Sequence, residues 1–230
     1  MMCFIDFHIH SKYSFDSLLE PRTIIKVARK KNLLGVAVTD HNTIRGGIET
    51  SKINNIDNDN NFVVIVGIEV KTNFGDLIGL FLNEEIKSRD FFEVADNIRE
   101  QGGIVVLPHP FRTFSEINFL KEIVKHIDVI EGFNARMKSD ILNKKAQSFA
   151  KDHNLPLIAG SDAHFTHEIG RGLTKFQEEH LEIDEIRTSI LHNKCRLYGK
   201  ILPLPIYVLY EFIIGKSLDK IRRRISYLKN

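Results

Sequence analysis

Short hydrophobic runs alternate along this chain with longer stretches in which apolar residues recur at helical spacing. The runs are rich in β-branched residues and almost continuously apolar, which is typical of strands buried on both faces of a parallel sheet. The stretches at residues 20–32, 89–101, 115–126 and 139–154 predict amphipathic helices that cover such a sheet. Seven runs are too many for a small open sheet and favour a barrel-like α/β fold. They span residues 2–9, 35–41, 62–70, 76–82, 102–110, 128–134 and 156–164.

Two segments fall outside this alternation. Residues 54–61 read NNIDNDNN, a polar run of low complexity that predicts a loop. Residues 201–230 begin with prolines, carry apolar residues at helical spacing and end in a basic stretch, so we expect a final helix packed on the barrel. A helix lying on a membrane surface is the less favoured alternative, and the apolar part is too short and too interrupted to cross a bilayer.

Composition narrows the class of protein only a little. The chain has 230 residues, of which 43% are hydrophobic and 27% charged, as in a soluble globular protein with a sizeable core. Its net charge of +2 gives no strong attraction to membranes or nucleic acid, and we expect no stable binding of long nucleic acid. The two cysteines, Cys3 and Cys195, form neither a disulfide framework nor a zinc-ribbon pattern. They favour a reducing, cytoplasmic setting, and no signal peptide is visible before the first apolar run.

Acidic and histidine side chains gather at the ends of the predicted strands. In a parallel barrel the carboxyl ends of the strands meet on one face, where catalytic groups are displayed. His8 and His10 are two residues apart on the first strand, so their side chains point to the same side and can hold one ion together. The other residues at strand ends are Asp40, His41, Glu69, His109, Asn134, Asp162 and His164.

Each of these residues has an ordinary structural explanation when it is taken alone. A single histidine such as His109 is more often hydrogen-bonded than ligating, and Asp162 on its own could cap a helix. Five of the ten histidines nevertheless fall at strand ends, and four acids, among them Asp16, accompany them. Burying these charges together without a cation would be costly, whereas a multinuclear metal centre removes that cost.

The motifs HIH, TDHN, GIEV, PHP, FNAR and GSDAH, in this order, resemble the PHP (polymerase and histidinol phosphatase) superfamily of metal-dependent phosphoesterases. The resemblance extends from His8 to about Phe176, and IGRGLTKF after the last motif looks like the C-terminal extension of stand-alone members. It implies a distorted (β/α)7 barrel over residues 1–200, with the extension beginning at about residue 165 and the metal site at the carboxyl ends of the strands. It also implies two or three divalent ions, which in this family are usually zinc, manganese or iron.

Carried over to this chain, the resemblance implies three ion sites. Four side chains would hold the first ion, and Glu69 would also reach a second ion held by His109 and Asn134. Asp16 stands where the histidinol phosphatase-like branch has a histidine, and its carboxylate favours harder ions such as manganese or iron(II), with zinc still allowed. Asn134 stands where other members have histidine, and its neutral amide oxygen would be a weak ligand. The first ion would take His8, His10, Glu69 and Asp162, and the third would take Asp16, His41 and His164.

The same resemblance implies hydrolysis of phosphate esters by a hydroxide that bridges two of the ions. Arginine recognises phosphate through its forked geometry, and Arg112 in HPFR and Arg136 in FNAR are the candidates for that role. Asp40 precedes a ligand and is placed to orient an imidazole. The FNAR motif looks more like the branch that acts on small nucleotides and oligonucleotides, so the expected substrate is a small nucleotide or a short oligonucleotide.

Three alternatives stay open at this point. The chain could be a phosphomonoesterase of a non-nucleotide metabolite, as in the histidinol phosphatase-like branch. It could catalyse an amidohydrolase-type reaction on a carbon–nitrogen bond, although no lysine stands at a strand end to bridge two ions in that style. It could also be a metal-binding module without turnover, which the complete ligand set argues against. The sequence leaves the choice between monoester and diester, the identity of the metal and the oligomeric state open.

Overall fold

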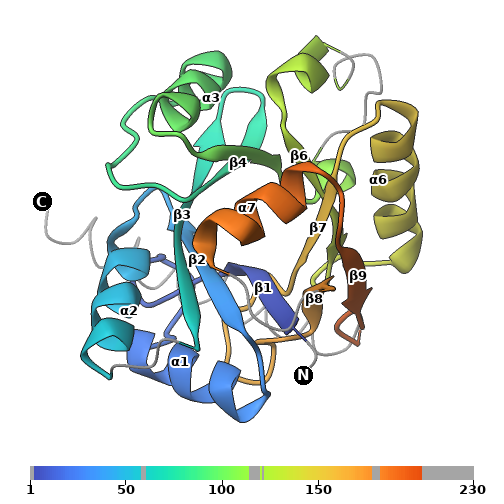
Figure 1. Cartoon of the computed structure of the whole chain (residues 1–230). Helices are drawn as coiled ribbons and strands as arrows, with labels where there is room; N and C mark the ends of the chain where they lie inside the picture. The colour runs from blue at the N-terminus through green and yellow to red at the C-terminus, as the bar shows by residue number, and fades with distance from the viewer. Residues whose placement is uncertain (1–2, 58–60, 114–119, 121, 178–181, 204–230) are drawn as a thin grey trace, which may run out of the picture.

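The computed structural model describes residues 3–57, 61–113, 120, 122–177 and 182–203. Within these residues, nine strands form one sheet that curls into a nearly closed barrel, with most of the helices around its outside (Figure 1). The strands are β1 (Cys3–Ile9), β2 (Gly35–His41), β3 (Val63–Thr72), β4 (Gly75–Leu80), β5 (Ile104–Leu107), β6 (Val129–Asn134), β7 (Leu157–Gly160), β8 (Gly172–Phe176) and β9 (Arg196–Gly199). The helices are α1 (Pro21–Lys30), α2 (Arg45–Ile56), α3 (Phe91–Glu100), α4 (Pro110–Thr113), α6 (Asp140–Asp152) and α7 (Ile183–Leu191), and Val124–His126 form a 3-10 turn.

The strands follow the order β7-β6-β5-β4-β3-β2-β1-β8-β9 across the sheet. β1, β2 and β3 pair in parallel, and so do β5, β6 and β7. The barrel closes where the chain leaves β7, because Ala163 pairs in parallel with Ile9 at the end of β1. The carboxyl ends of the parallel strands therefore lie around one opening, which is the arrangement that the α/β prediction requires.

The prediction of an all-parallel sheet is wrong at β4. This strand runs antiparallel to both of its neighbours, β3 and β5. Only residues 73 and 74 separate the end of β3 from the start of β4. A connection this short forms a hairpin, since a parallel neighbour needs a crossover of a dozen or more residues. Gly75 opens β4 with a φ of 113°, a conformation that favours glycine.

Two strands extend the sheet beyond the seven predicted runs. β8 pairs antiparallel with β1, and β9 pairs antiparallel with β8. Both lie in the segment that the sequence assigns to a C-terminal extension. At Gly172 a Cβ atom would stand 2.0 Å from the carbonyl oxygen of Gly160, so β8 approaches the end of β7 too closely for any side chain. The barrel-like α/β fold is thus confirmed, but its sheet is larger and of mixed direction.

The helices α1, α3 and α6 lie where the sequence predicts them. α3 begins after Asp90, whose carboxylate accepts hydrogen bonds from two backbone N–H groups of the first turn, and α6 begins after Ser139, whose hydroxyl accepts one. Half of the predicted helix over 115–126 lies outside the described residues. Of the other half, residues 120, 122 and 123 are helical and Val124–His126 form the 3-10 turn. The final helix expected over 201–230 falls almost wholly outside the described residues as well.

The predicted loop at residues 54–61 is wrong at its start. Asn54 is buried in the last turn of α2, where its amide accepts from Arg29 and donates to the carbonyl of Phe62. These hydrogen bonds come from segments distant in sequence, so composition alone could not show them. α2 and α7 are both absent from the predicted helices. No helix within the described ranges has the length and apolar character needed to cross a membrane.

A hydrophobic cluster closes the end of the barrel where the parallel strands begin. It contains Cys3, Ile104 and Val129, which are the first residues of β1, β5 and β6, and Ile186 and Ile190 from α7. α7 lies across this part of the molecule (Figure 1). The hydrophobic interior therefore fills one end of the barrel, and the polar residues at the strand ends occupy the other.

Candidate metal centre

The strands deliver buried histidine and acidic side chains to the end of the barrel opposite α7. The strand-end ligands predicted from the sequence lie together there, and Asp16 joins them from the loop between β1 and α1. The ligands form two groups. The inner group consists of His8, His10, Glu69, His109 and Asp162, all nearly inaccessible to solvent, and the outer group consists of Asp16, His41 and His164.

The inner group brings four ligand atoms to one point. The Nε2 atoms of His8 and His10 lie 3.0 Å apart. Oε2 of Glu69 is 3.5 and 3.3 Å from these two nitrogens, and Oδ1 of Asp162 is 3.7 and 3.4 Å from them. Ligands about 2.0–2.2 Å from a zinc ion stand at such separations from one another. The four residues are those expected to share the first ion.

Glu69 reaches both sides of the inner group through its two oxygens. While Oε2 faces His8 and His10, Oε1 lies 3.0 Å from Nε2 of His109. The backbones of His109 and Asp162 have φ values of 30° and 55°, in the left-handed region that side-chain-bearing residues rarely adopt. Strained backbone of this kind clusters at functional sites, and here it occurs at two of the predicted ligands.

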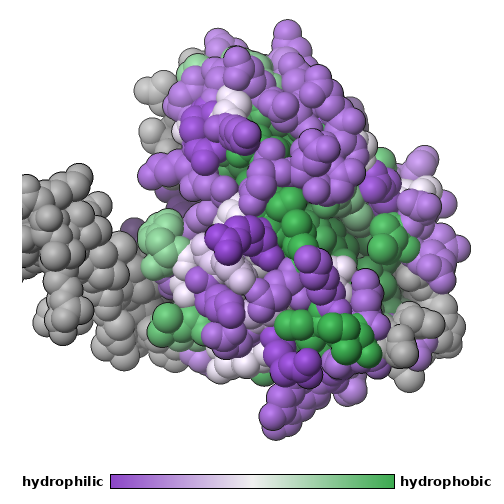
Figure 2. Space-filling model, turned by 90° about the vertical axis from the view of Figure 1, so that its left-hand side faces the viewer, coloured by the Kyte–Doolittle hydropathy of each residue, from purple (hydrophilic) through white to green (hydrophobic). Residues whose placement is uncertain are grey.

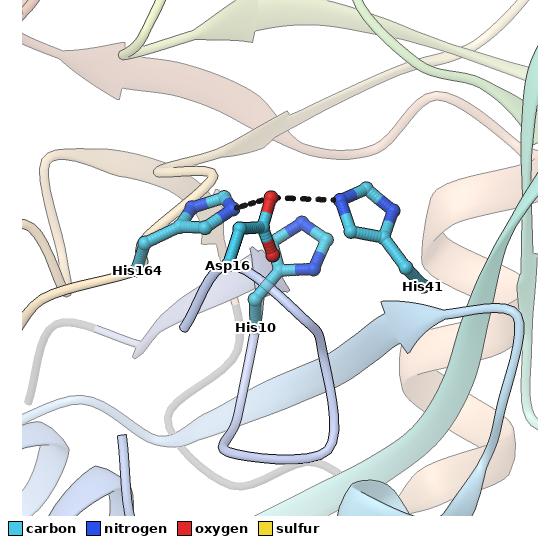
Figure 3. A group of neighbouring side chains, drawn as sticks. All are labelled: His10, Asp16, His41 and His164. Carbon is cyan, nitrogen blue, oxygen red and sulfur yellow. Dashed lines mark hydrogen bonds and ion pairs between the residues drawn. The ribbon is translucent and has the colours of Figure 1, made fainter. Parts of the chain in front are cut away.

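The outer group is built around Asp16. Its Oδ2 atom lies 3.2 Å from Nε2 of His41 and 3.0 Å from Nε2 of His164, so it stands between the two rings (Figure 3). The Nδ1 atom of His164 lies 2.9 Å from the backbone oxygen of Asp162, and Nδ1 of His41 lies 3.1 Å from Oε2 of Glu69. In neutral rings with hydrogen on Nδ1, both Nε2 atoms would turn a lone pair toward the position that Asp16 faces. This is the arrangement on which the predicted third site depends.

The two imidazoles beside Asp16 have opposite protonation tendencies. Burial disfavours the charged form of His41, but the Glu69 and Asp16 carboxylates outweigh it and raise the pKa of His41 to about 10. Burial and the neighbouring His10 lower the pKa of His164 to about 4. Burial also opposes charge on Glu69, yet the imidazoles of His8 and His41 hold the pKa of its carboxyl well below the usual range. A protonated His41 thus compensates the charge of the neighbouring carboxylates, and a bound cation would take the place of that proton.

Divalent ions fit this set of side chains. Three sets of side chains, each with three or four members, could hold an ion. Within each set the ligand atoms all lie within 4.8 Å of one another. Within the described residues, Oδ1 of Asp16 and Nδ1 of His109 are buried without a hydrogen-bond partner. Neutral imidazoles and carboxylates are ligands for zinc, manganese and iron alike. The sets are His10, Asp16, His41 and His164; His8, His10 and Asp162; and His8, Glu69 and His109.

Glu131 is a part of the centre that the sequence reasoning missed. Its carboxylate is buried and accepts hydrogen bonds from Nδ1 of His8 at 2.9 Å, from the backbone of His109 at 2.9 Å and from the amide of Asn134 at 3.0 Å. It therefore orients one ligand ring and fixes the backbone of another. The signal was present, because Glu131 is the single charged residue inside the apolar run of β6.

Asp6 supports the backbone that carries the ligands. Asp6 accepts hydrogen bonds from three backbone N–H groups, those of His8, Ser161 and Gly170, a supporting role that agrees with its place one layer deeper on β1. Burial raises the pKa of Asp6 to about 6.

Asp40, predicted to orient an imidazole, makes no direct hydrogen bond to a ring within the described part of the chain. Its carboxylate instead accepts hydrogen bonds from Ser11 and Ser14. Any influence that it has on an imidazole must pass through a serine hydroxyl.

Asn134 connects the centre to an arginine. Its amide oxygen accepts hydrogen bonds from Nη2 of Arg112 and from the backbone of Arg136, both at 2.9 Å. Its amide nitrogen donates to Oδ2 of Asp162 at 3.2 Å. The side chain is thus committed to hydrogen bonds on both sides, and its role as a ligand beside His109 stays a prediction.

The two candidate phosphate-binding arginines differ in exposure. Arg112 donates from Nη2 to Oδ2 of Asp162 at 2.7 Å, and 29% of its side chain is exposed. Arg136 is 6% exposed and lies 3.4 Å from the carboxylate of Glu168. Arg112 therefore stands at the accessible edge of the centre, whereas Arg136, which follows β6, is enclosed against the loop that carries His164 and Glu168.

Comparison with known proteins places the chain in a family. The sequence profile described as PHP-associated matches residues 140–195. An uncharacterised protein of Methanocaldococcus jannaschii is 38% identical over 186 residues, which are 77% of this chain and 72% of that protein. The chain belongs to the PHP superfamily. The profile covers α6, β7, β8 and α7, so this part of the PHP chain includes Asp162 and His164 of the centre.

Solved structures share the PHP fold at low sequence identity. A two-domain Bacteroides vulgatus protein, containing a predicted PHP-like metal-dependent phosphoesterase, has a TM-score of 0.72 and 18% identity over 87% of this chain. This chain spans 65% of that protein. A lesion-specific endonuclease from Pyrococcus furiosus has a TM-score of 0.60 and 19% identity, covering 86% of this chain and 58% of its own. The common feature is the fold of PHP-like metal-dependent phosphoesterases.

Proposed function

We propose that this PHP protein is a metal-dependent hydrolase of phosphate esters, with small nucleotides or short oligonucleotides as substrates. The observation that carries the proposal is the convergence of His8, His10, Glu69 and Asp162 on one point, with Arg112 hydrogen-bonded to the last of them. An array of nitrogen and carboxylate ligands next to an accessible guanidinium suits a phosphate group.

The proposed division of labour follows from the contacts. Divalent ions held by the inner and outer groups would activate water and offset the charge of the phosphate oxygens. Glu69 would be shared between ions, because its two oxygens face different histidines. Both hydrogen bonds of Arg112 recorded within the described residues come from Nη2, which leaves other N–H groups of the guanidinium for a phosphate oxygen. Arg136 would contribute a second positive charge from the loop after β6, where it pairs with Glu168.

An exposed aromatic ring beside the outer group supports a nucleotide substrate. Phe15 is 67% exposed, and its ring is nearly parallel to that of His41, with centroids 5.1 Å apart and an angle of 21°. One face of the phenyl ring covers the imidazole. A nucleobase stacked on an aromatic side chain contributes about 1–3 kcal/mol, so Phe15 is suited to hold the base of a nucleotide whose phosphate lies at the metal centre.

The hydrolase proposal is tested by assaying the purified protein with nitrophenyl phosphate and its bis-ester after loading with Mn²⁺, Zn²⁺ or Fe²⁺. We expect metal-dependent hydrolysis, and the preferred ester decides between monoester and diester chemistry. Arg112→Ala should lower kcat/KM about 100-fold, as the loss of a group that stabilises transition-state charge does. Arg22→Ala, whose side chain is 69% exposed on α1, is the matched control. Lack of hydrolysis of both esters with every ion would overturn the proposal, and an unchanged KM and kcat in Arg136→Ala would remove Arg136 from the site.

The substrate class has a separate test. Phe15→Ala should reduce kcat/KM for a nucleoside monophosphate about tenfold and leave glycerol phosphate unaffected, because only the first has a ring to stack. Leu18→Ala, in the same loop and 85% exposed, serves as the control. An equal loss with both substrates would show that Phe15 acts on the metal centre and not on a base.

A further inference from the structure

The hydroxyl of Ser14 lies between the inner and outer groups and contacts both. Ser14 is 3% exposed and belongs to the loop that joins His10 to Asp16. Its Oγ atom lies 3.1 Å from Nδ1 of His10, accepts a hydrogen bond from the backbone N–H of His41 at 3.0 Å, and donates to Oδ1 of Asp40 at 2.7 Å. One buried hydroxyl therefore has three partners, which is the full capacity of a serine side chain.

Counting hydrogens at this hydroxyl fixes the role of each partner. Serine carries one hydrogen, and it points to the carboxylate of Asp40. The backbone N–H of His41 can only donate, so it occupies one lone pair of Oγ. The remaining lone pair faces Nδ1 of His10, and two acceptors cannot share a hydrogen bond. Nδ1 of His10 must therefore be the donor, which leaves the Nε2 atom of the neutral ring with its lone pair free.

That lone pair is aimed at the inner group. Nε2 of His10 is the atom that lies 3.0 Å from Nε2 of His8 and 3.3 and 3.4 Å from the oxygens of Glu69 and Asp162. Asp40 is held in turn by the backbone and hydroxyl of Ser11, both at 2.6 Å. The N-terminal turn of α2 packs so closely on this pair that a Cβ atom at Gly46 would stand 1.9 Å from Oδ2 of Asp40. The acceptor that orients Ser14 is itself rigidly placed.

We propose that Ser14 is a positioning residue. Its hydroxyl links the Asp40 carboxylate to Nδ1 of His10, and this relay fixes the tautomer in which the His10 ring can bind a metal ion. The same hydroxyl anchors the backbone of His41, so it sets one histidine of each group at a fixed distance from the other. His10 also belongs to ligand sets of both groups. This inference rests on the proposed metal centre, but it is independent of the reaction and of the substrate.

The test measures Zn²⁺ binding and ring protonation in the full chain, without an activity assay. Zn²⁺ affinity is obtained by competition with a chromophoric chelator. Nitrogen-15 spectra of histidine-labelled, Zn²⁺-loaded protein report which ring nitrogen of His10 carries hydrogen, with the signal assigned by its loss in His10→Gln. The wild type should show hydrogen on Nδ1 of His10 in slow exchange with solvent. Ser14→Ala should bind Zn²⁺ about 10- to 100-fold more weakly, the usual effect of removing a group that orients a ligand, and its Nδ1 hydrogen should exchange rapidly.

Two further variants separate positioning from general packing. Ser17→Ala alters the same loop. The Ser17 hydroxyl donates to the backbone oxygens of His10 and His164 and, within the described residues, to no imidazole. The Nδ1 signal of His10 in this variant should therefore match the wild type. Ser14→Thr keeps the hydroxyl and should restore both the signal and the affinity. Wild-type affinity and slow Nδ1 exchange in Ser14→Ala would overturn the relay, as would equal losses in Ser14→Ala and Ser17→Ala. Failure of the wild type to bind Zn²⁺ would overturn the metal centre itself.

Discussion

The two ends of the barrel are built from the same strands and filled in opposite ways. Where β1, β5 and β6 begin, apolar side chains pack against Ile186 and Ile190 of α7. Where the parallel strands finish, they present imidazoles and carboxylates such as His8 and Glu69, which are just as inaccessible to solvent. The space-filling view of one side shows apolar surface only in patches among polar residues (Figure 2).

The difference shows what each end requires to be stable. The α7 end is completed by side chains alone, because apolar groups need only to be removed from water. The ligand end contains buried charges, and those are tolerated only when they are paired, hydrogen-bonded or bound to a metal. The first end should therefore respond to changes in volume, and the second to changes in charge and in metal content.

Glu69→Ala should have the largest effect. It removes the carboxylate that faces both sides of the inner group, so we expect kcat/KM for the better ester substrate to fall at least about 1000-fold, or about 4 kcal/mol. Metal analysis should show fewer ions per chain. Glu100→Gln, exposed on α3, is the control and should behave like the wild type. Retention of both activity and metal content would show that Glu69 is not a ligand.

Ile190→Ala should destabilise the opposite end without touching the metals. The side chain is fully buried, and an Ile-to-Ala change at such a site lowers the free energy of unfolding by about 2–5 kcal/mol. Urea unfolding measures this loss, while Leu191→Ala, at a position 43% exposed, should change stability by less than about 0.5 kcal/mol. The contrast between the ends fails if Ile190→Ala also lowers the number of bound ions.

Removal of the ions should destabilise the protein through the ligand end. With Zn²⁺ at about 100 times its dissociation constant, binding to the folded state adds about 2.7 kcal/mol to the free energy of unfolding. Thermal unfolding with and without a chelator should show this shift in the wild type and equally in Ile190→Ala. The shift should shrink in Glu69→Ala. An identical shift in all three proteins would mean that the ions bind elsewhere.

The smallest effect concerns the thiol of Cys195, which packs against the apolar cluster at the α7 end. Burial raises the pKa of this thiol to about 11, so little thiolate is present at pH 8. Alkylation by iodoacetamide should then be about 100-fold slower than for an exposed thiol with a pKa of about 8.5. The rate should rise about tenfold per pH unit as the pH increases toward the pKa. Mass analysis of the peptide containing Cys195 measures the rate, and a plateau near pH 9 would contradict the burial of this end.

Part of the site follows from residue spacing within one strand, and the structure agrees with that part. Alternation along a strand puts His8 and His10 on one side, and the order of the motifs places the remaining ligands at successive strand ends. The position of Asp16 beside His41 and His164 also agrees with the sequence-based ligand set. Alternation within one segment explains the pairing of His8 and His10. The placement of Asp16 beside His41 and His164 is implied by the family resemblance, because these residues lie in different segments.

Other features depend on which segments meet, and spacing does not contain that information. Glu131 orients His8 from 123 residues away, and Ser14 reaches Asp40 across 26 residues. The antiparallel course of β4 follows from a two-residue turn, and α7 completes the apolar end only once the sheet has curled. The sequence by itself predicted the candidate ligands and the strands that carry them. The tertiary structure decided which polar groups hold those ligands in place, because a hydrogen bond is made between atoms that meet in space.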